Sequence, residues 1–343
     1  MRVTNKAVER LNGISTSLEN TVKPAILAAS LLLLNQQATA AEADVPGPAA
    51  LVDALNGTFG KHPGKRGSHA KGFCAKGDFT PAPQVAQFVN SPLFAQARVD
   101  AAIRFSIGGG NPGVSDKSRS VRGLSMRLTG GNETYDLLLI SEPVFFAATP
   151  ASFVSFLEAR VPDPVTKKPD PAKVAAHNAK YPDGKNQPAL LASHTAPASY
   201  AATPYFSTNA FVFEGAGSAK QHARIVVEPA AGTLYLSDDE EKTMPDNFLE
   251  AELAQRLALR PAEFTIYAQL PAQGDSLIDS SQQWQGNGHV ALGTLRVTAL
   301  AAQSCDGVVF MPVTLPAGIT PSADPILNAR APAYAISLGR RTQ

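Results

Sequence analysis

The feature that most constrains the fold is a series of short segments in which polar and apolar residues alternate. Seven such segments read as strands, and they occupy residues 99–107, 120–128, 134–140, 205–213, 222–228, 263–270 and 290–300. The turn Thr129-Gly-Gly-Asn132 between two of them is typical of an antiparallel hairpin. The pattern predicts an α+β chain built on an antiparallel β-barrel of about eight strands, with helices packed outside it.

Three other segments read as helices that should pack against the barrel. They are 49–57, 151–160 and 246–260, and the last has leucines at four-residue intervals and Asp246 as its expected N-cap. The stretch 161–188 is rich in proline, lysine and aspartate, which predicts a long surface excursion.

The composition restricts the class of partner. Hydrophobic residues make up 44% of the 343 residues, which is enough for the core of one large barrel domain. The formal net charge is +1, and no basic block indicates nucleic-acid binding. We therefore expect small-molecule partners and a single domain, 41–343, that does not insert stably into a membrane.

The first forty residues have the order of an export signal. Basic residues come first, and the apolar run 26–34 that follows is too short for the roughly 20 residues that span a bilayer. Ala38-Thr39-Ala40 then matches a cleavage pattern of small residues. We expect 1–40 to be removed and the protein to be periplasmic. The long basic region leaves two alternatives, an uncleaved amphipathic anchor and a start codon further downstream.

Cys74 and Cys305 are the two cysteines of the chain. They could pair in an oxidising compartment, but two cysteines so far apart in the sequence do not make a disulfide framework. We favour two independent buried thiols and leave pairing open.

The C-terminal residues place a tyrosine among arginines. If they are helical, Arg330, Tyr334 and Arg341 share one face, and Pro332 is tolerated only near the first turn, so the helix should begin close to it. A guanidinium one turn away favours the phenolate form of the tyrosine, and a phenolate is a suitable ligand for ferric iron. The alternative is an ordinary C-terminal helix with an interface tyrosine.

Two further segments carry candidate polar residues. His69 lies in a turn-rich loop, where a histidine is usually just exposed. In the strand 99–107, Arg104 and Ser106 share one face, and apolar residues occupy the other. An arginine and a hydroxyl on one face suit an enclosed polar site, and they equally suit a strand with one side in water.

Five motifs, in the same order, resemble the signatures of the tyrosine-ligated haem catalases. They are Arg66-Gly-Ser-His69-Ala-Lys-Gly72, Arg104-Phe-Ser106, Arg122-Gly123 through Arg127, Pro143-Val-Phe145-Phe146, and Arg330-x-x-x-Tyr334 with Arg341. The last motif departs from the family pattern Arg-x-Phe-x-Tyr-x-Asp-Thr at Pro332, Ile336 and Ser337. With the export signal, the resemblance implies the small branch called catalase-related peroxidases, which has the catalase-like barrel and lacks the C-terminal helical domain.

The resemblance also implies a set of site residues around a haem b placed inside the barrel. Tyr334 would be the iron ligand and Arg330 would stabilise its phenolate. His69 would be the catalytic acid–base group, oriented by Ser106. The other expected cofactor-binding residues are the propionate partners Arg66, Arg104 and Arg341 and the aromatic residues Phe145 and Phe153.

One departure from the family bears on the reaction. Three residues before Pro143 the family has a catalytic asparagine, and this chain has Ile140. We therefore expect a peroxidase that reduces hydrogen peroxide, or organic peroxides, with small organic electron donors and with little catalase activity. The alternatives are a genuine catalase, an enzyme that rearranges lipid hydroperoxides, and a non-enzymatic haem-binding barrel. Oligomerisation is left open, and the remaining histidines are expected to be surface or structural: His62, His177, His194, His222 and His289.

Overall fold

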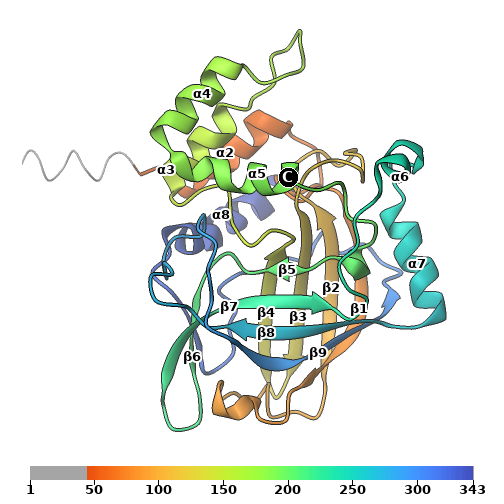
Figure 1. The fold of residues 1–343 in the computed structure, drawn as a ribbon, viewed down its shortest axis with the longest axis vertical. Coiled ribbons are helices and arrows are strands. Elements are labelled where there is room, and N and C mark those ends of the chain that lie inside the picture. Colours follow the sequence, from red (N-terminus) through yellow and green to blue (C-terminus); the bar gives the residue numbers. More distant parts are fainter. Residues whose placement is uncertain (1–44, 343) are drawn as a thin grey trace, which may run out of the picture. The chain divides into compact units, whose positions relative to one another are not determined.

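Eight antiparallel strands close into a barrel in the computed structural model, which describes residues 45–342. Their order is β7-β5-β4-β3-β2-β1-β9-β8, and β8 pairs back to β7 (Figure 1). The strands are β1 (Gly72–Pro81), β2 (Val99–Ile107), β3 (Arg122–Gly130), β4 (Glu133–Ile140), β5 (Tyr205–Phe206), β7 (Lys220–Pro229), β8 (Ala262–Gln269) and β9 (His289–Leu300). Two short strands, β6 (Phe211–Glu214) and β10 (Ile319–Pro321), extend the sheet beyond β7. The predicted α+β barrel is confirmed.

Apolar side chains fill the barrel interior. On β2, Ile103, Phe105 and Ile107 are at most 1% exposed and belong to a cluster to which strands all around the barrel contribute. Arg104 and Ser106 alternate with them and therefore lie on the outer face. The expected haem position inside the barrel is wrong, because the apolar half of each strand occupies that space.

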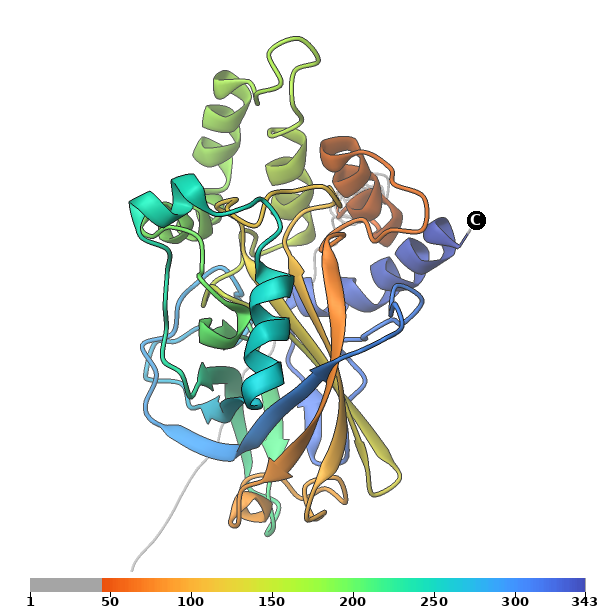
Figure 2. The ribbon, with the colours of Figure 1, turned by 90° about the vertical axis from the view of Figure 1, so that its right-hand side faces the viewer.

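The helices cover parts of the outside. α2 (Pro48–Phe59), α3 (Pro150–Glu158) and α8 (Pro325–Arg341) pack together and bury a second apolar cluster. Figures 1 and 2 show α8 outside the barrel, beside α2 and α3. α7 (Leu249–Leu259) packs on β9 and contributes the buried Leu253 to the barrel core.

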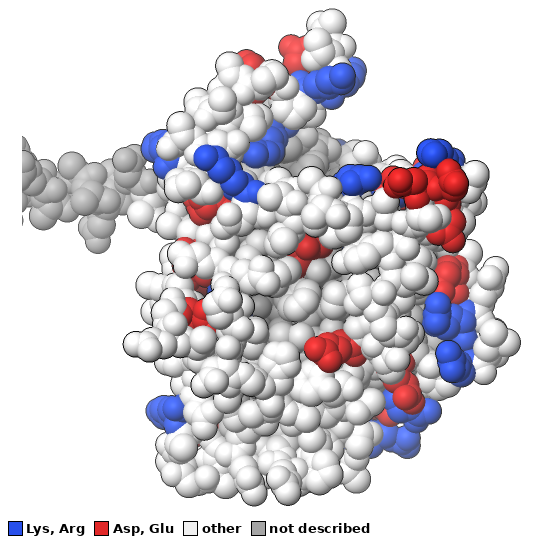
Figure 3. Space-filling view, in the orientation of Figure 1, with Lys and Arg blue, Asp and Glu red and all other residues white. Residues whose placement is uncertain are grey.

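Charged side chains on the face drawn in Figure 3 gather along α6 (Asp238–Thr243) and α7. Ion pairs link several of them, such as Arg256 with Glu252 at 2.6 Å and Arg119 with Glu241 at 3.4 Å. Exposed pairs of this kind stabilise a fold only slightly. We assign them to the solvated surface.

The C-terminal helix begins earlier than expected, at Pro325 and not near Pro332. Asp324 caps it, since its carboxylate accepts hydrogen bonds from the backbone N–H groups of Ile326 and Leu327 at 2.8 and 3.2 Å. A proline at the first helical position fits this start. Pro332 lies exposed inside the helix, and the proline that marks its first turn is Pro325.

Three local predictions also differ from the structure. The stretch 161–188 is not only a loop, because it contains α4 (Pro171–Lys180). Asp246 does not cap α7, and its carboxylate instead accepts a hydrogen bond from Ser115 and pairs with a lysine. The predicted strand 205–213 is divided into β5 and β6.

Cys74 and Cys305 form a disulfide, so the preference for two thiols is wrong. They are 231 residues apart in the sequence, but their Cα atoms are 6.1 Å apart. β1 pairs with β9, and this pairing brings the start of β1 next to the segment that follows β9. A contact of this kind depends on strand order, which the cysteine spacing does not reveal.

Within residues 45–342, no helix is both long and apolar enough to cross a membrane. The predicted export signal at 1–40 lies outside the described residues.

Candidate functional site

The first part of the site lies on the outer face of β2, β3 and β4. Ser106, Gly123 and Ile140 are direct cross-strand neighbours and share this face. His69 lies in the loop before β1, and its Nδ1 is 3.0 Å from Ser106 Oγ. Its backbone has a φ of 54°, a left-handed conformation that is uncommon for residues other than glycine. Such strained residues occur preferentially at functional sites.

Gly123 makes room for this pair. A β-carbon at Gly123 would lie 2.5 Å from Ser106 Oγ and 2.7 Å from His69 Nδ1. Both distances are shorter than any ordinary van der Waals contact, so a side chain here would displace the imidazole or the hydroxyl. The absence of a side chain at this position is a condition for the His69–Ser106 contact.

The surroundings of His69 keep its ring neutral. Burial, together with the charges of Arg104, Arg330 and Arg66, lowers the pKa of His69 to about 3. The residue as a whole is only partly inaccessible, but every cause acts in the same direction. If Nδ1–H donates to Ser106, then Nε2 is free to accept a proton.

The second part of the site lies on α8. Arg330 donates from Nε and Nη2 to the Tyr334 hydroxyl at 3.3 and 3.0 Å, so the predicted pair is in contact. Its Nη1 donates to Asn209 Oδ1 at 2.7 Å, and Asn209 Nδ2 donates to Asp324 Oδ2 at 2.8 Å. Asn209 and Asp324 are almost fully buried. Asp324, at the start of α8, thus fixes the side-chain amide of Asn209, and Asn209 in turn holds the Arg330 guanidinium against Tyr334.

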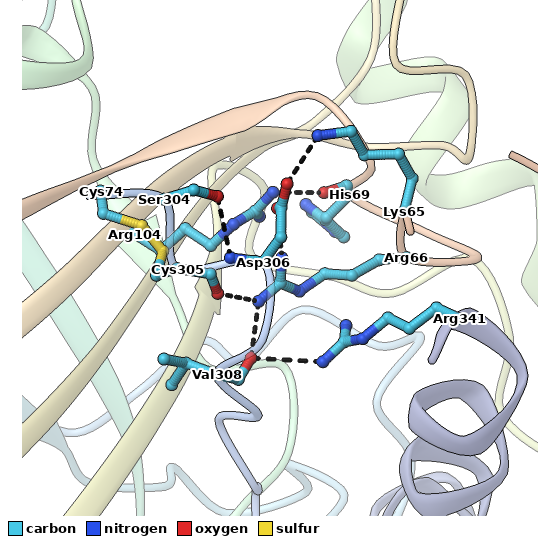
Figure 4. Close-up of a disulfide and its surroundings, with 10 residues drawn as sticks. All are labelled: Lys65, Arg66, His69, Cys74, Arg104, Ser304, Cys305, Asp306, Val308 and Arg341. Carbon is cyan, nitrogen blue, oxygen red and sulfur yellow. Dashed lines mark hydrogen bonds and ion pairs between the residues drawn. A yellow bond between two sulfur atoms is a disulfide. The ribbon is translucent and has the colours of Figure 1, made fainter. Parts of the chain in front are cut away.

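The third part is a cluster of arginines. Arg66, Arg104 and Arg341 come from the loop before β1, from β2 and from the last turn of α8, and they converge on residues 305–308 (Figure 4). Burial and the charges of Arg104 and Arg341 lower the pKa of Arg66 to about 9, although Asp306 opposes the shift. Burial likewise lowers the pKa of Arg104 and of Arg341. One carboxylate among three crowded guanidinium groups leaves an excess of positive charge.

The aromatic residues Phe145 and Phe153 lie on the side of α3 and α8. Their rings are stacked with centroids 6.1 Å apart, and both belong to the apolar cluster of α2, α3 and α8. That cluster also includes Ala329, Ala333 and Ile336 of α8. Tyr334 therefore lies on a helix in which several nearby residues are apolar.

These three parts fit a haem group. The Nε atoms of Arg104 and Arg341 are buried and have no hydrogen-bond partner among the described residues, and carboxylates such as propionates would satisfy them. A tyrosine oxygen beside a guanidinium suits ferric iron, and the apolar cluster suits a flat macrocycle. Arg330 links the first part of the site to the second, because its charge lowers the pKa of His69 and its guanidinium donates a hydrogen bond to Tyr334. A groove of about 600 Å³ also occurs on the outer face of β1 and β2, but neither His69 nor Tyr334 lines it.

Some residues of the site escaped the sequence reasoning. Asn209 and Asp306 lie in irregular segments and have no motif of their own, and Gly123 was recognised only as part of a motif. The one feature of the sequence that could have indicated Asn209 is its position as a polar residue between apolar strand segments. Among the remaining histidines, His177 is buried and its Nδ1 lies 2.9 Å from Ser155 Oγ, which agrees with a structural role.

The chain is similar to known proteins over most of its length. The sequence profile of the family described as Catalase matches residues 50–342. A "Catalase-related peroxidase" of Synechococcus elongatus is 36% identical over 301 residues, which cover 86% of this chain and 89% of that protein. Another of the same name, from Mycolicibacterium paratuberculosis, is 33% identical over 300 residues, covering 86% and 95% respectively.

Solved structures share the fold at lower sequence identity. A fungal catalase has a TM-score of 0.74 and 20% identity, and the match covers 82% of this chain and 60% of that one. Catalase A from Saccharomyces cerevisiae has a TM-score of 0.72 and 19% identity, covering 99% and 68%. The chain thus spans about 60% of the length of the fungal catalase.

Proposed function

The chain belongs to the catalase family, and on this premise we propose that it is a haem-dependent peroxidase that reduces hydrogen peroxide with small organic electron donors. Two contacts carry the proposal: His69 pairs with Ser106, and Tyr334 pairs with Arg330, whose charge also lowers the pKa of His69. A neutral base and a tyrosine that accepts hydrogen bonds from a cation suit peroxide cleavage at a ferric haem.

His69 moves the proton in this proposal. Its neutral Nε2 accepts a proton from one oxygen of hydrogen peroxide and returns it to the other, so that a water molecule can leave. Ser106 fixes the ring and its tautomer, and Gly123 leaves the ring where it can reach the substrate. Haem, when bound, supplies the redox centre that passes oxidising equivalents to the donor.

Tyr334 and the arginines hold the cofactor. Tyr334 would supply the iron ligand, and Arg330 donates two hydrogen bonds to its oxygen. Asn209 and Asp324 keep the guanidinium in place. Arg66, Arg104 and Arg341 bind the propionates, because charge-assisted hydrogen bonds are the strong ones.

Ile140 favours peroxidase turnover over dismutation. It is the cross-strand neighbour of Gly123, on the face that carries Ser106, and its side chain cannot form a hydrogen bond with a second peroxide molecule. We expect Ile140→Asn to raise the rate of oxygen evolution by roughly tenfold or more, since a hydrogen bond is gained at that face. Ile140→Val, which stays apolar, is the control, and equal oxygen evolution in all three proteins would contradict the role of Ile140.

The function is tested by comparing two products in protein reconstituted with haem b. We expect oxidation of an aromatic one-electron donor to exceed oxygen evolution at equal peroxide concentration. Dominant oxygen evolution would show a genuine catalase. Haem bound without either activity would show a haem-binding barrel.

We also propose that the protein works in an oxidising compartment such as the periplasm. The disulfide between Cys74 and Cys305 supports this, because disulfides persist in exported proteins and are rare in the cytosol. Mass spectrometry of the protein recovered from its native cell would test whether the first forty residues are removed.

A further inference from the structure

The disulfide holds one particular segment against the site. Cys305 lies in the irregular chain between β9 and β10, and Cys74 lies on β1 (Figure 4). The backbone N–H of Ala301 donates to the Cys74 carbonyl at 2.8 Å, so the segment leaves the sheet there and returns to the same residue at Cys305. Residues 302–304 are thereby tied to β1 at both ends, and residues 306 and 307 follow directly.

Residues 305–308 supply every hydrogen bond that Arg66 makes within the described part of the chain. Arg66 donates to the carbonyls of Cys305 and Val308 at 3.0 and 2.6 Å and to Asp306 Oδ1 at 3.0 Å. Arg341 also donates to the Val308 carbonyl, at 3.4 Å. The segment thus joins the loop that carries His69 to the last turn of α8.

The disulfide is the strongest of the links that order residues 302–307. Their other described polar links to the rest of the chain are those of Lys65 and Arg66 to Cys305 and Asp306. Lys65 and Asp306 are partly exposed, and ion pairs at such positions stabilise a structure only slightly. Firm anchors resume beyond Val308, where Arg127 donates to the Val309 carbonyl at 2.7 Å. Without the sulfur bridge, Cys305 and Asp306, which provide two of the three acceptors of Arg66, would be held by weak contacts alone.

We propose that the Cys74–Cys305 disulfide is a redox-sensitive clamp on the arginine cluster, and that its reduction by a dithiol weakens retention of the haem. The inference rests on the proposed function for its cofactor, and on the described contacts for the clamp itself.

The reducing step is an ordinary thiol–disulfide exchange. One thiolate of the dithiol attacks a sulfur of the bridge and forms a mixed disulfide, and the protein sulfur that leaves takes up a proton. The second thiolate of the reagent then closes its own ring and releases the other cysteine. Two electrons pass from the dithiol to the protein, which ends with two thiols. The reagent can reach the bridge, because both cysteines line the groove of about 600 Å³ and Cys305 is partly exposed.

Loss of the clamp has two opposed effects on haem binding. A freed Asp306 no longer competes with a propionate for Arg66, which favours binding. Arg66 also loses the Cys305 carbonyl as a fixed acceptor and keeps only that of Val308, so its direction is less fixed and the three like charges can separate. Fixed geometry contributes most to an arginine–carboxylate contact, since a mobile pair at a partly exposed rim contributes little. The second effect therefore dominates.

The experiment measures the clamp with and without haem. In cofactor-free protein, dithiothreitol should increase deuterium uptake at residues 302–308 while α7 stays protected. In holoprotein, it should speed transfer of haem to an excess of an apo-globin acceptor by roughly tenfold or more, the effect of losing a charge-assisted contact. Cys74→Ser combined with Cys305→Ser should reproduce the fast transfer and should not respond to dithiothreitol.

A control separates the clamp from general loss of stability. Leu253→Ala in α7 removes a buried core side chain, and the described structure places no site residue on that helix. It should destabilise the protein without speeding haem transfer. Equal transfer rates for oxidised and reduced wild type, or uptake at 302–308 that is unchanged by reduction, would overturn the proposal. Failure of the protein to bind haem at all would instead refute the proposed function, and the deuterium measurement would still test the clamp.

Discussion

His69→Val is expected to lower the rate constant for reaction with hydrogen peroxide by ~10²–10⁴-fold while haem binding is kept. The reason is that His69 is a base that contacts Ser106 and is held neutral by its burial and by the neighbouring arginines. Valine cannot take a proton from the peroxide, and Tyr334 and the arginine cluster still hold the cofactor. Stopped-flow absorbance of the haem after mixing with peroxide measures the rate.

The control for this prediction is His289→Val. His289 is exposed at the start of β9, away from the described site, so its loss should leave the rate unchanged. If His69→Val reacts as fast as the wild type, then the acid–base role assigned to His69 is wrong.

The depressed pKa of His69 adds a dependence on pH. An unperturbed imidazole titrates near 6.5, and His69 in the folded protein titrates near 3. The rate of the peroxide reaction should therefore be independent of pH from pH 8 down to about 5, and an inflection near 6.5 would contradict the neutral ring.

The same pKa affects stability. Since the unfolded chain binds the proton more readily than the folded protein, the contribution of His69 to stability is complete above pH 6.5 and is lost as the pH falls towards 3. Chemical unfolding of the cofactor-free protein at several pH values gives the slope of the free energy of unfolding against pH. Between pH 6.5 and 3, this slope should correspond to about one proton fewer in His69→Val than in the wild type.

Gly123→Ala is expected to produce a second large loss, of ~10²-fold in the same rate constant, without removing any reacting group. The new methyl group would lie 2.5 Å from Ser106 Oγ and 2.7 Å from His69 Nδ1, so the ring must turn away. A displacement of about 1 Å is enough for an effect of this size.

Gly57→Ala is a matched control for Gly123→Ala. A β-carbon at Gly57, in α2, meets no atom within 4 Å, and the residue has no unusual backbone conformation. The variant should keep the wild-type rate. A Gly123→Ala protein with the wild-type rate would mean that the His69–Ser106 geometry is not needed for the reaction.

The sequence indicated the barrel and several site residues because both follow from local patterns. Alternation in 99–107 placed Arg104 and Ser106 on one face, and the structure confirms that face. The same pattern could have shown that the face is the outer one, since Ile103, Phe105 and Ile107 are the larger apolar set and must fill the interior.

Other features depend on contacts that no local pattern encodes. The disulfide requires β1 and β9 to be neighbours, and Asn209 meets Arg330 only because the segment between β5 and β6 passes α8. The start of α8 was open to prediction, because Asp324 and Pro325 form a standard cap and first turn. Pro332 lies nearer the tyrosine, but it is inside the helix and not at its start.

The central claim is that the oxygen of Tyr334, held by Arg330, binds the iron of a ferric haem, and one absorption spectrum tests it most directly. The wild-type protein reconstituted with haem b should show a high-spin ferric Soret band without the features of a histidine ligand. Tyr334→Phe should lose that spectrum together with its reactivity toward peroxide. A Tyr334→Phe protein with an unchanged spectrum and unchanged peroxide reactivity would contradict the account.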